Sequence, residues 1–226
     1  MFRPKELYIG LRYTRAKRRN GFVSFIALLS MLGIALGVAA LIVVLSVMNG
    51  FGKELRERTL GMTAHATVTG QDGRLDDWQS VQAKISKHPN VLNSAPFTQN
   101  EAMLSNRSRV SGAIIRGVFP TLEPSVSDID EKMVSGKLAD LKPGEFGIIL
   151  GRELANAMGV FEGEKITVIT PQANVTPVGV MPRLKRFTVV GVFEAGMHQF
   201  DRSMAIINIQ GAQKLFSMGS SVEGLR

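Results

Sequence analysis

An uninterrupted apolar segment is the feature that most constrains this chain. Residues 20–52 contain no charged side chain, and only Ser24, Ser30 and Ser46 interrupt the apolar residues between 22 and 48. A helix rises about 1.5 Å per residue, so this run crosses a hydrocarbon core of about 30 Å with length left for tilt. A cleaved signal peptide has an apolar region of only about 7 to 15 residues. The sequence therefore predicts an uncleaved transmembrane helix over residues 20–52.

Flanking charge predicts the orientation of this helix. Residues 1–19 carry seven Lys or Arg side chains and one acid, so they hold six of the eight net positive charges of the chain. Lys and Arg are retained on the cytoplasmic side of a membrane, so we expect a cytoplasmic arm that faces anionic membrane lipid. Since the excess charge lies in this arm and not on a folded domain, it does not indicate nucleic-acid binding, and we expect no nucleic-acid partner.

The rest of the chain predicts a stalk and one domain of mixed α+β class. Residues 53–60 are charged and favour helix, and we expect this helical stalk to stop at Gly61. In residues 61–226, runs rich in β-branched residues predict strands at 65–69, 109–118, 147–150, 165–170, 187–193 and 204–209. Helical spacing predicts helices at 76–87, where two acids provide caps, and at 152–158 and 211–216. The order of the strands does not follow from these patterns.

A search of the domain for catalytic or metal-binding residues gives no candidate. The chain has no Cys, and His65, His88 and His198 lie far apart in sequence. Three neighbouring acids, Asp72, Asp76 and Asp77, are explained by turn and helix-cap chemistry. We therefore expect no catalytic residue, no metal site and no cofactor in this chain, and we do not expect it to be an enzyme.

A proline-bounded segment, residues 171–182, is the best candidate for an interaction site. It lies between two predicted strands as the tip of a long hairpin, and Lys185 and Arg186 follow it. Three prolines and Gly179 predict that strand pairing stops here, and its valines and Met181 have no regular period by which to enter a core. Exposed apolar residues on such a projection indicate a docking surface. The alternative is a loop that folds back on its own domain.

The predicted transmembrane helix has two further features. Gly33 and Gly37 lie four residues apart, a spacing that permits close packing against another helix. Val44, Met48 and Phe51 share one face near the outer end of the helix. This face is predicted to contact lipid or a neighbouring helix, and an acyl chain of a bound cargo is the alternative.

Several segments together resemble a known family. They are Leu-Tyr-Ile-Gly-Leu-Arg-Tyr at 7–13, Gly-Ile-Ala-Leu-Gly-Val at 33–38, Leu-Ser-Val-Met-Asn-Gly-Phe at 45–51, Ile-Ile-Leu-Gly at 148–151 and Met-Gly-Ser-Ser-Val at 218–222. In combination they resemble the lipoprotein-releasing ABC transporter permeases of the LolC/LolE type, from the inner membrane of Gram-negative bacteria. The resemblance covers essentially the whole chain.

The resemblance implies a location and a set of partners. The chain is expected in the Gram-negative inner membrane, with a cytoplasmic N-terminus and a periplasmic main domain. The implied partners are a cytoplasmic ABC ATPase dimer that holds ATP and Mg²⁺, a second permease subunit (homologous or identical), a periplasmic lipoprotein carrier and the lipoprotein cargo. The implied activity is ATP-driven extraction of lipoproteins from the outer leaflet of the inner membrane and their transfer to the carrier.

In the carrier-binding member of this family, a hairpin called the hook docks the carrier. The resemblance assigns this role to residues 171–182, with contacts from Pro171, Val175, Thr176, Pro177, Val178, Gly179, Val180, Met181 and Pro182, and with support from Lys185 and Arg186. The segment before Thr176 is one residue shorter than the family pattern, and Thr167 stands where a basic residue is expected. The Met-Gly-Ser-Ser-Val segment resembles the hookless partner subunit, so a hook-bearing, a hookless and a hybrid subunit all stay open.

Family members have three more transmembrane helices after the periplasmic domain, so the resemblance also implies a chain truncated before them. Two alternative functions stay open. One is that of a related permease-like protein for macrolide or other small-molecule efflux, or for cell-division signalling. The other is that of a periplasmic binding protein or enzyme anchored by one helix.

Overall fold

The structure is a computed structural model that describes residues 8–10, 12, 21–62, 64–70, 72–176 and 179–226. The chain divides into two compact units, residues 1–54 and 55–226. Each unit is described by itself below.

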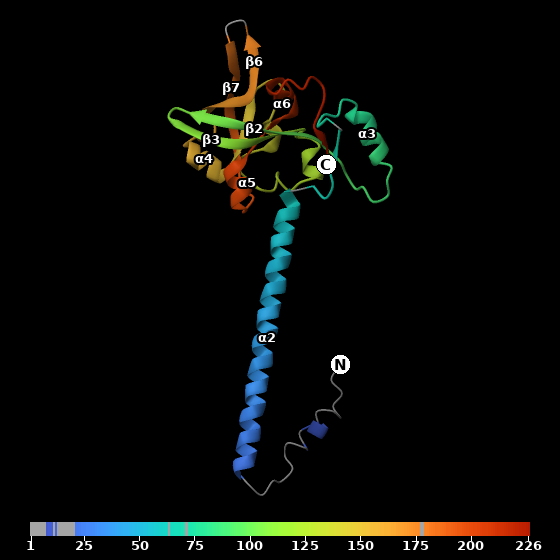
Figure 1. Ribbon diagram of the computed structural model, residues 1–226, viewed down its shortest axis with the longest axis vertical. Coiled ribbons are helices and arrows are strands. Elements are labelled where there is room, and N and C mark those ends of the chain that lie inside the picture. Colours follow the sequence, from blue (N-terminus) through green and yellow to red (C-terminus); the bar gives the residue numbers. More distant parts are fainter. Residues whose placement is uncertain (1–7, 11, 13–20, 63, 71, 177–178) are drawn as a thin grey trace. The chain divides into compact units, whose positions relative to one another are not determined.

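Helix α2 (Gly21–Met62) contains the predicted transmembrane segment (Figure 1). Its stretch Phe25–Glu54 is long and apolar enough to cross a membrane by length and composition, with a mean hydropathy of 2.8. The helix continues through Gly61 to Met62, so the predicted stop at Gly61 is wrong. One glycine in a helix costs only about 1 kcal/mol relative to alanine, which is too little to end a long helix by itself.

Within the described residues of the second unit, nine strands form one sheet. The strands are β1 (Val68–Thr69), β2 (Pro96–Asn106), β3 (Arg109–Val118), β4 (Met133–Gly136), β5 (Gly147–Gly151), β6 (Lys165–Thr176), β7 (Gly179–Phe193), β8 (Met204–Asn208) and β9 (Gly224–Leu225). The helices are α3 (Trp78–Ile85), α4 (Arg152–Met158), α5 (His198–Ser203) and α6 (Ile209–Leu215), with 3₁₀ turns at Glu123–Ser125 and Leu138–Asp140. The predicted α+β class is confirmed.

Six of the strands close into a barrel. Strand β2 pairs with β3, β3 with β8, β8 with β5, β5 with β7, β7 with β6, and β6 again with β2. The closing contact between β6 and β2 is short, from Met103 opposite Ile169 to Ser105 opposite Thr167. Closure removes the open edges that an unpaired strand would expose.

The main hydrophobic core lies inside this barrel. Each barrel strand contributes two buried residues spaced two apart to one cluster, as Leu104 and Ala102 do from β2 and Phe187 and Val189 do from β7. Helices α4 and α6 add Leu154, Met158 and Leu215 to the same cluster. Strands β5 and β8 are buried on both faces, because a second cluster with Ile149 and Ile206 covers their other side. This explains the continuous apolar runs that the sequence shows there.

The element predictions can now be compared with the structure. Strand 109–118 and helix 152–158 are confirmed at both ends. The strand predicted at 65–69 covers only Val68–Thr69, the helix predicted at 76–87 begins at Trp78, and residue 209 starts α6 instead of ending β8. The side chain of Asp77 does not cap α3 and instead accepts a hydrogen bond from the Ser80 hydroxyl. Strands β2, β4 and β9 and helix α5 were not predicted.

Candidate functional site

The hairpin of β6 and β7 projects from the barrel (Figure 1). The two strands pair from Lys165 opposite Thr188 to Thr176 opposite Gly179. In the described ranges, β6 residues after Ile169 pair only with β7 residues 179–183, and these β7 residues pair only with β6. The outer part of the hairpin therefore stands free of the other strands, as the docking interpretation requires.

The expectation that the prolines and Gly179 stop the pairing is wrong. The ladder has one irregularity, between Thr170 and Ala173, and then resumes with Ala173 opposite Pro182. Proline lacks the N–H group that a central strand must donate, but it is tolerated at bulges and on edges. Pro171 lies at the irregularity, and Pro182 lies where β7 has only one neighbouring strand, so neither proline breaks the ladder.

The predicted docking residues fall into three groups. Pro171 and Pro182 are exposed at the base of the free part of the hairpin, and Lys185 and Arg186 are exposed just below it. Val175, Thr176, Gly179, Val180 and Met181 belong to the paired strands. Pro177 and Val178 lie outside the described residues.

A groove lined by three basic side chains lies beside the hairpin base, and one of the three, Lys214, was not predicted from the sequence. The Lys185 ammonium lies 3.8 Å from the centre of the Phe146 ring, a cation–π contact. Phe146 packs edge-on against the buried Phe187, which holds the ring in place. Arg183 and Lys214 line the same groove of about 490 Å³. Lys214 comes from α6, so only the fold brings it to the hairpin.

The predicted sites on α2 are exposed in the first unit. Val44, Met48 and Phe51 are exposed along one face of the helix. A side-chain carbon added at Gly33 or Gly37 would meet no atom within 4 Å. Both features are therefore accessible to lipid or to another helix.

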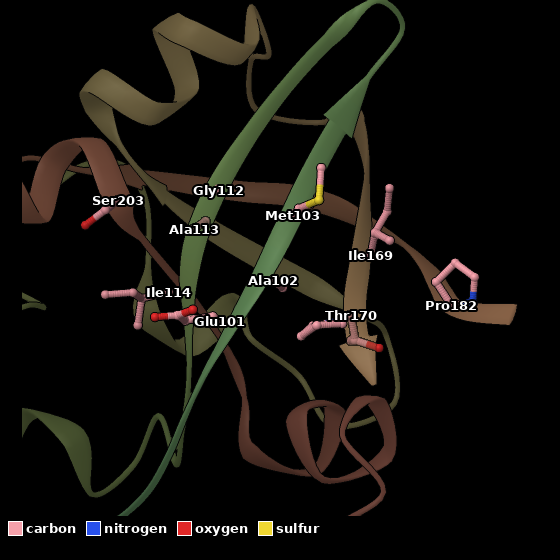
Figure 2. Close-up of a pocket in the computed structure, with 11 residues that line it drawn as sticks. Glu101, Ala102, Met103, Gly112, Ala113, Ile114, Ile169, Thr170, Pro182 and Ser203 are labelled. Carbon is pink, nitrogen blue, oxygen red and sulfur yellow. The ribbon is translucent and has the colours of Figure 1, made fainter. Parts of the chain in front are cut away.

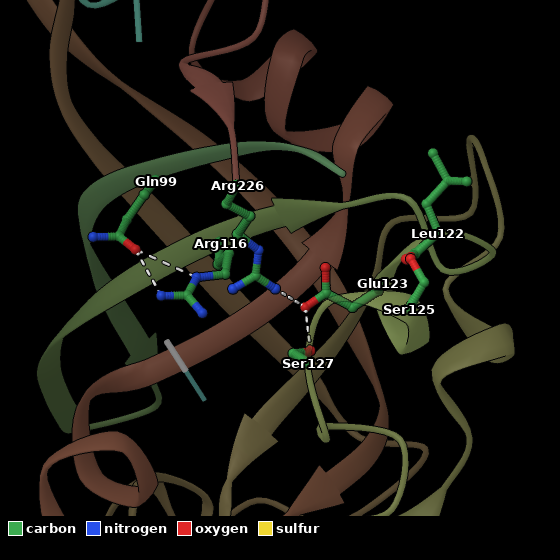
Figure 3. A network of polar contacts seen from close by, with 7 residues as sticks. All are labelled: Gln99, Arg116, Leu122, Glu123, Ser125, Ser127 and Arg226. Carbon is green, nitrogen blue, oxygen red and sulfur yellow. Dashed lines mark hydrogen bonds and ion pairs between the residues drawn. The ribbon is translucent and has the colours of Figure 1, made fainter. Parts of the chain in front are cut away.

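A buried ion pair is the main polar feature that the sequence did not reveal. The Arg226 guanidinium contacts the Glu123 carboxylate, and their side chains are only 3% and 2% exposed (Figure 3). The Ser127 hydroxyl donates to Glu123 Oε1 at 2.7 Å. Glu123 Oε2 and Arg226 Nε are buried without a hydrogen-bond partner. The two charged residues are 103 positions apart, so no local pattern could have shown the contact.

Arg116 extends this network toward β2. Its guanidinium donates to Gln99 Oε1, with Nη2 at 2.9 Å from the oxygen (Figure 3). Burial, followed by the nearby charge of Arg226, lowers the pKa of Arg116 to about 10. Burial also raises the pKa of Glu223, against the opposing effects of the Gln99 backbone N–H, 2.7 Å away, and of Arg116. The pKa of Arg116 of about 10 lies well above neutral pH, so Arg116 stays charged there. The network joins β2, β3, the 3₁₀ turn at Glu123–Ser125 and the segment after β9, and it has the character of a structural anchor.

The residues considered for metal binding or catalysis do not assemble into a site. Within the described residues, no group of three or more His, Asp or Glu side chains could hold a metal ion. Asp77 contacts Ser80 at the start of α3, and Asp72 lies in the turn that the Gly73 N–H closes onto the Gly70 carbonyl. The projecting hairpin and the grooves at its base are thus the candidate functional site.

Comparison with known proteins gives a consistent result. Residues 27–224 match the family described as MacB-like periplasmic core domain. The chain is 49% identical to the lipoprotein-releasing system transmembrane protein LolC of Neisseria meningitidis, over 98% of this chain and 53% of the relative. It is 48% identical to LolC of Xylella fastidiosa, over 100% and 54%, and 31% identical to LolE of Haemophilus influenzae, over 91% and 50%. The chain therefore spans about half the length of these curated relatives.

Proposed function

Because this chain belongs to the family of MacB-like periplasmic core domain proteins and is of the LolC/LolE type within it, we propose that it acts as a membrane subunit of an ATP-driven lipoprotein-releasing transporter. Its identities to LolC and LolE of the same organism, Haemophilus influenzae, are 34% and 31%, so either subunit type fits this role. In this role a separate cytoplasmic ATPase dimer hydrolyses ATP, and a second permease subunit completes the pathway.

The proposed topology places α2 across the Gram-negative inner membrane. The apolar stretch Phe25–Glu54 and the basic residues before it support a cytoplasmic N-terminus and a periplasmic barrel domain. Val44, Met48 and Phe51 then face lipid or the acyl chains of the cargo. Gly33 and Gly37 offer the close packing surface for a helix of the partner subunit.

The β6–β7 hairpin is proposed to dock the periplasmic lipoprotein carrier. The observation that carries this proposal is that, in the described ranges, β6 residues after Ile169 and β7 residues before Leu184 pair only with each other, while the barrel strands share one hydrophobic core. A two-stranded hairpin is only marginally stable alone. A partner that covers its apolar residues removes apolar surface from water, and this stabilises both the hairpin and the complex. Val175, Val180 and Met181, with Val178 next to them in sequence, are the proposed contacts.

The basic groove is proposed to give the docked carrier a second, electrostatic contact. Arg183, Lys185 and Lys214 line it, and none of its lining residues is acidic. Lys185 is held in place by its contact with Phe146, so part of its side-chain entropy is lost before a partner binds. Arg186 is exposed and follows Lys185 in β7, so its side chain lies on the other face of the sheet. Such a charged rim accelerates association and fixes the orientation of a partner more than it adds affinity.

Substitution in the hairpin tests this function. The full chain in detergent is mixed with the purified soluble carrier, and capture is measured for wild type, for Val178→Asp with Met181→Asp, and for Gln172→Asp. Gln172→Asp is the control for added negative charge, because it adds one carboxylate to the same hairpin at a polar position, where the double variant adds two at apolar positions. Burial of one apolar side chain contributes about 1.5–3 kcal/mol to binding. The loss of even one such contact in the double variant is therefore expected to weaken carrier binding by at least about tenfold.

Capture of the carrier by the double variant at the wild-type level would contradict the docking assignment. Unfolding is monitored by the fluorescence of Trp78, the single tryptophan of the chain, which packs against Phe119 away from the hairpin. An unchanged melting temperature separates loss of docking from loss of fold.

A further inference from the structure

A second groove lies on the outer face of the barrel. Gly112 is opposite Met103, Met103 is opposite Ile169, and Ile169 is opposite Leu184, so these residues form one row across β3, β2, β6 and β7. Their sequence neighbours Ala102, Ala113 and Val168 belong to the barrel core, so the row faces outward. Met103 is 49% exposed and Leu184 is 61% exposed. The row is thus apolar and open to solvent.

Gly112, Met103 and Ile169 of this row line a groove of about 590 Å³ that reaches the base of the hairpin (Figure 2). Leu184, the last residue of the row, lines the basic groove instead. Ile114 lies toward one end, and Pro171 and Pro182 lie at the hairpin end. The volume is within the range of about 300–1,000 Å³ that is typical of small-ligand sites. Gly112 lines the groove without a side chain, and a carbon added there would meet no atom within 4 Å. Gly112 therefore leaves this part of the groove open, and a larger side chain at this position would enter it.

The lining selects for an uncharged apolar ligand. Among the described residues that line the groove, Glu101 is the one ionisable side chain, and the others are apolar apart from the hydroxyls of Thr170 and Ser203. A carboxylate beside an apolar groove repels the phosphate of a phospholipid. The basic groove at the hairpin base shows the opposite chemistry, with three cations and no acid. An acyl chain on an uncharged headgroup fits the apolar groove better than an anionic lipid does.

We propose that this groove binds an acyl chain of the uncharged lipid anchor of a lipoprotein. The proposal rests on the proposed function, because that function supplies such a cargo. It adds a binding site that ends where the carrier is proposed to dock, at Pro171 and Pro182. An acyl chain held there is shielded from water along one side while it is next to the docking hairpin.

Photocrosslinking tests the proposal. The full chain is placed in nanodiscs of phosphatidylcholine, and one of two probes with the same diazirine-bearing acyl chain is added: a synthetic triacylated lipopeptide or phosphatidylglycerol. Adducts are located by mass spectrometry. We expect the lipopeptide to label peptides that contain Met103, Ile114 or Ile169. Gly112→Phe places a ring in the groove and is expected to lower this labelling by at least about tenfold. A tenfold change corresponds to a loss of about 1.4 kcal/mol of binding free energy.

Two further variants sharpen the test. Val134→Phe adds the same ring at an exposed position of β4 outside the groove and is expected to label like wild type. Glu101→Lys reverses the charge of the lining and is expected to raise labelling by phosphatidylglycerol severalfold at the same peptides. Melting of each variant, followed by Trp78 fluorescence, shows whether the fold is kept.

Three results overturn the proposal: no lipopeptide adduct in the groove, adducts that Gly112→Phe does not reduce, or equal labelling by both probes in wild type. If Gly112→Phe instead lowers carrier capture while no lipid labels the groove, the groove is a protein contact and the proposal fails. If wild type captures the carrier but no lipopeptide labels the groove, the proposal of a lipid site is rejected and the docking function is kept. Groove labelling without carrier capture by wild type supports the lipid site and rejects the docking function.

Discussion

Removing the charge of Glu123 should strongly destabilise the barrel domain. Glu123→Gln keeps the shape of the side chain and an oxygen that can accept the Ser127 hydrogen bond, but it leaves the Arg226 guanidinium without its counter-charge. Arg116 makes this worse, because burial and, second, the charge of Arg226 already lower the pKa of Arg116, while the charge of Glu123 opposes them. The substitution therefore isolates the effect of one buried charge.

The expected magnitude follows from burial. A surface ion pair contributes at most about 1 kcal/mol, whereas breaking a buried pair costs about 3–5 kcal/mol. With side chains only 3% and 2% exposed, this pair belongs to the buried class. For a domain of this size, each kcal/mol shifts the melting temperature by about 2–4 °C, so we expect a decrease of about 10 °C.

The assay is thermal unfolding of the full chain in detergent, followed by Trp78 fluorescence, because α2 would dominate a helix signal from circular dichroism. The double variant Glu123→Met with Arg226→Met removes both charges and should recover most of the loss, since apolar pairs often replace buried ion pairs without cost. A decrease of less than about 2 °C for Glu123→Gln would place the pair in the surface class and refute the reasoning.

Two further predictions concern a glycine and a carboxylate. Gly117→Ala should destabilise the domain by about 1–3 kcal/mol, because its added carbon would lie 2.5 Å from Ala212 Cβ on α6. Gly112→Ala in the same strand is the control and should change stability little, because its added carbon would meet no atom within 4 Å. Equal urea midpoints for the two variants would contradict this. Burial raises the pKa of Glu223 in the folded state, so its contribution to stability is present at low pH and is lost as pH rises through the folded value. The stability of wild type relative to Glu223→Gln should therefore fall as pH rises above the ordinary glutamate pKa of about 4.3, and urea unfolding that shows no such trend would argue against the raised pKa.

Local patterns in the sequence were sufficient for several elements. The apolar run predicted the membrane-spanning part of helix α2, because all faces of this part are apolar over a length that few soluble helices reach. Strand β3 and helix α4 followed from residue spacing alone, since alternation and helical periodicity are properties of neighbouring residues. Strand β2 escaped prediction because it starts at a proline and its middle is polar, with Gln99 and Glu101 exposed and Asn100 half-buried.

The hairpin shows where local rules fail. Its existence and position followed from the sequence, but proline chemistry alone predicted that its pairing would stop. Pairing continues because the hairpin stands beyond the barrel, where Pro182 does not need to donate to a second neighbour. The context of a strand, and not its composition, decided the outcome.

By itself, the sequence determined the long apolar helix, the basic arm before it, the α+β class and the presence of a proline-bounded hairpin, because each of these is written in residues that are neighbours along the chain. Only the tertiary structure decided that β6 closes a barrel onto β2, that Lys214 joins Lys185 beside Phe146, and that Arg226 meets Glu123 in the interior. The physical reason is that these contacts join segments far apart in sequence, and their partners are chosen by the packing of the whole domain.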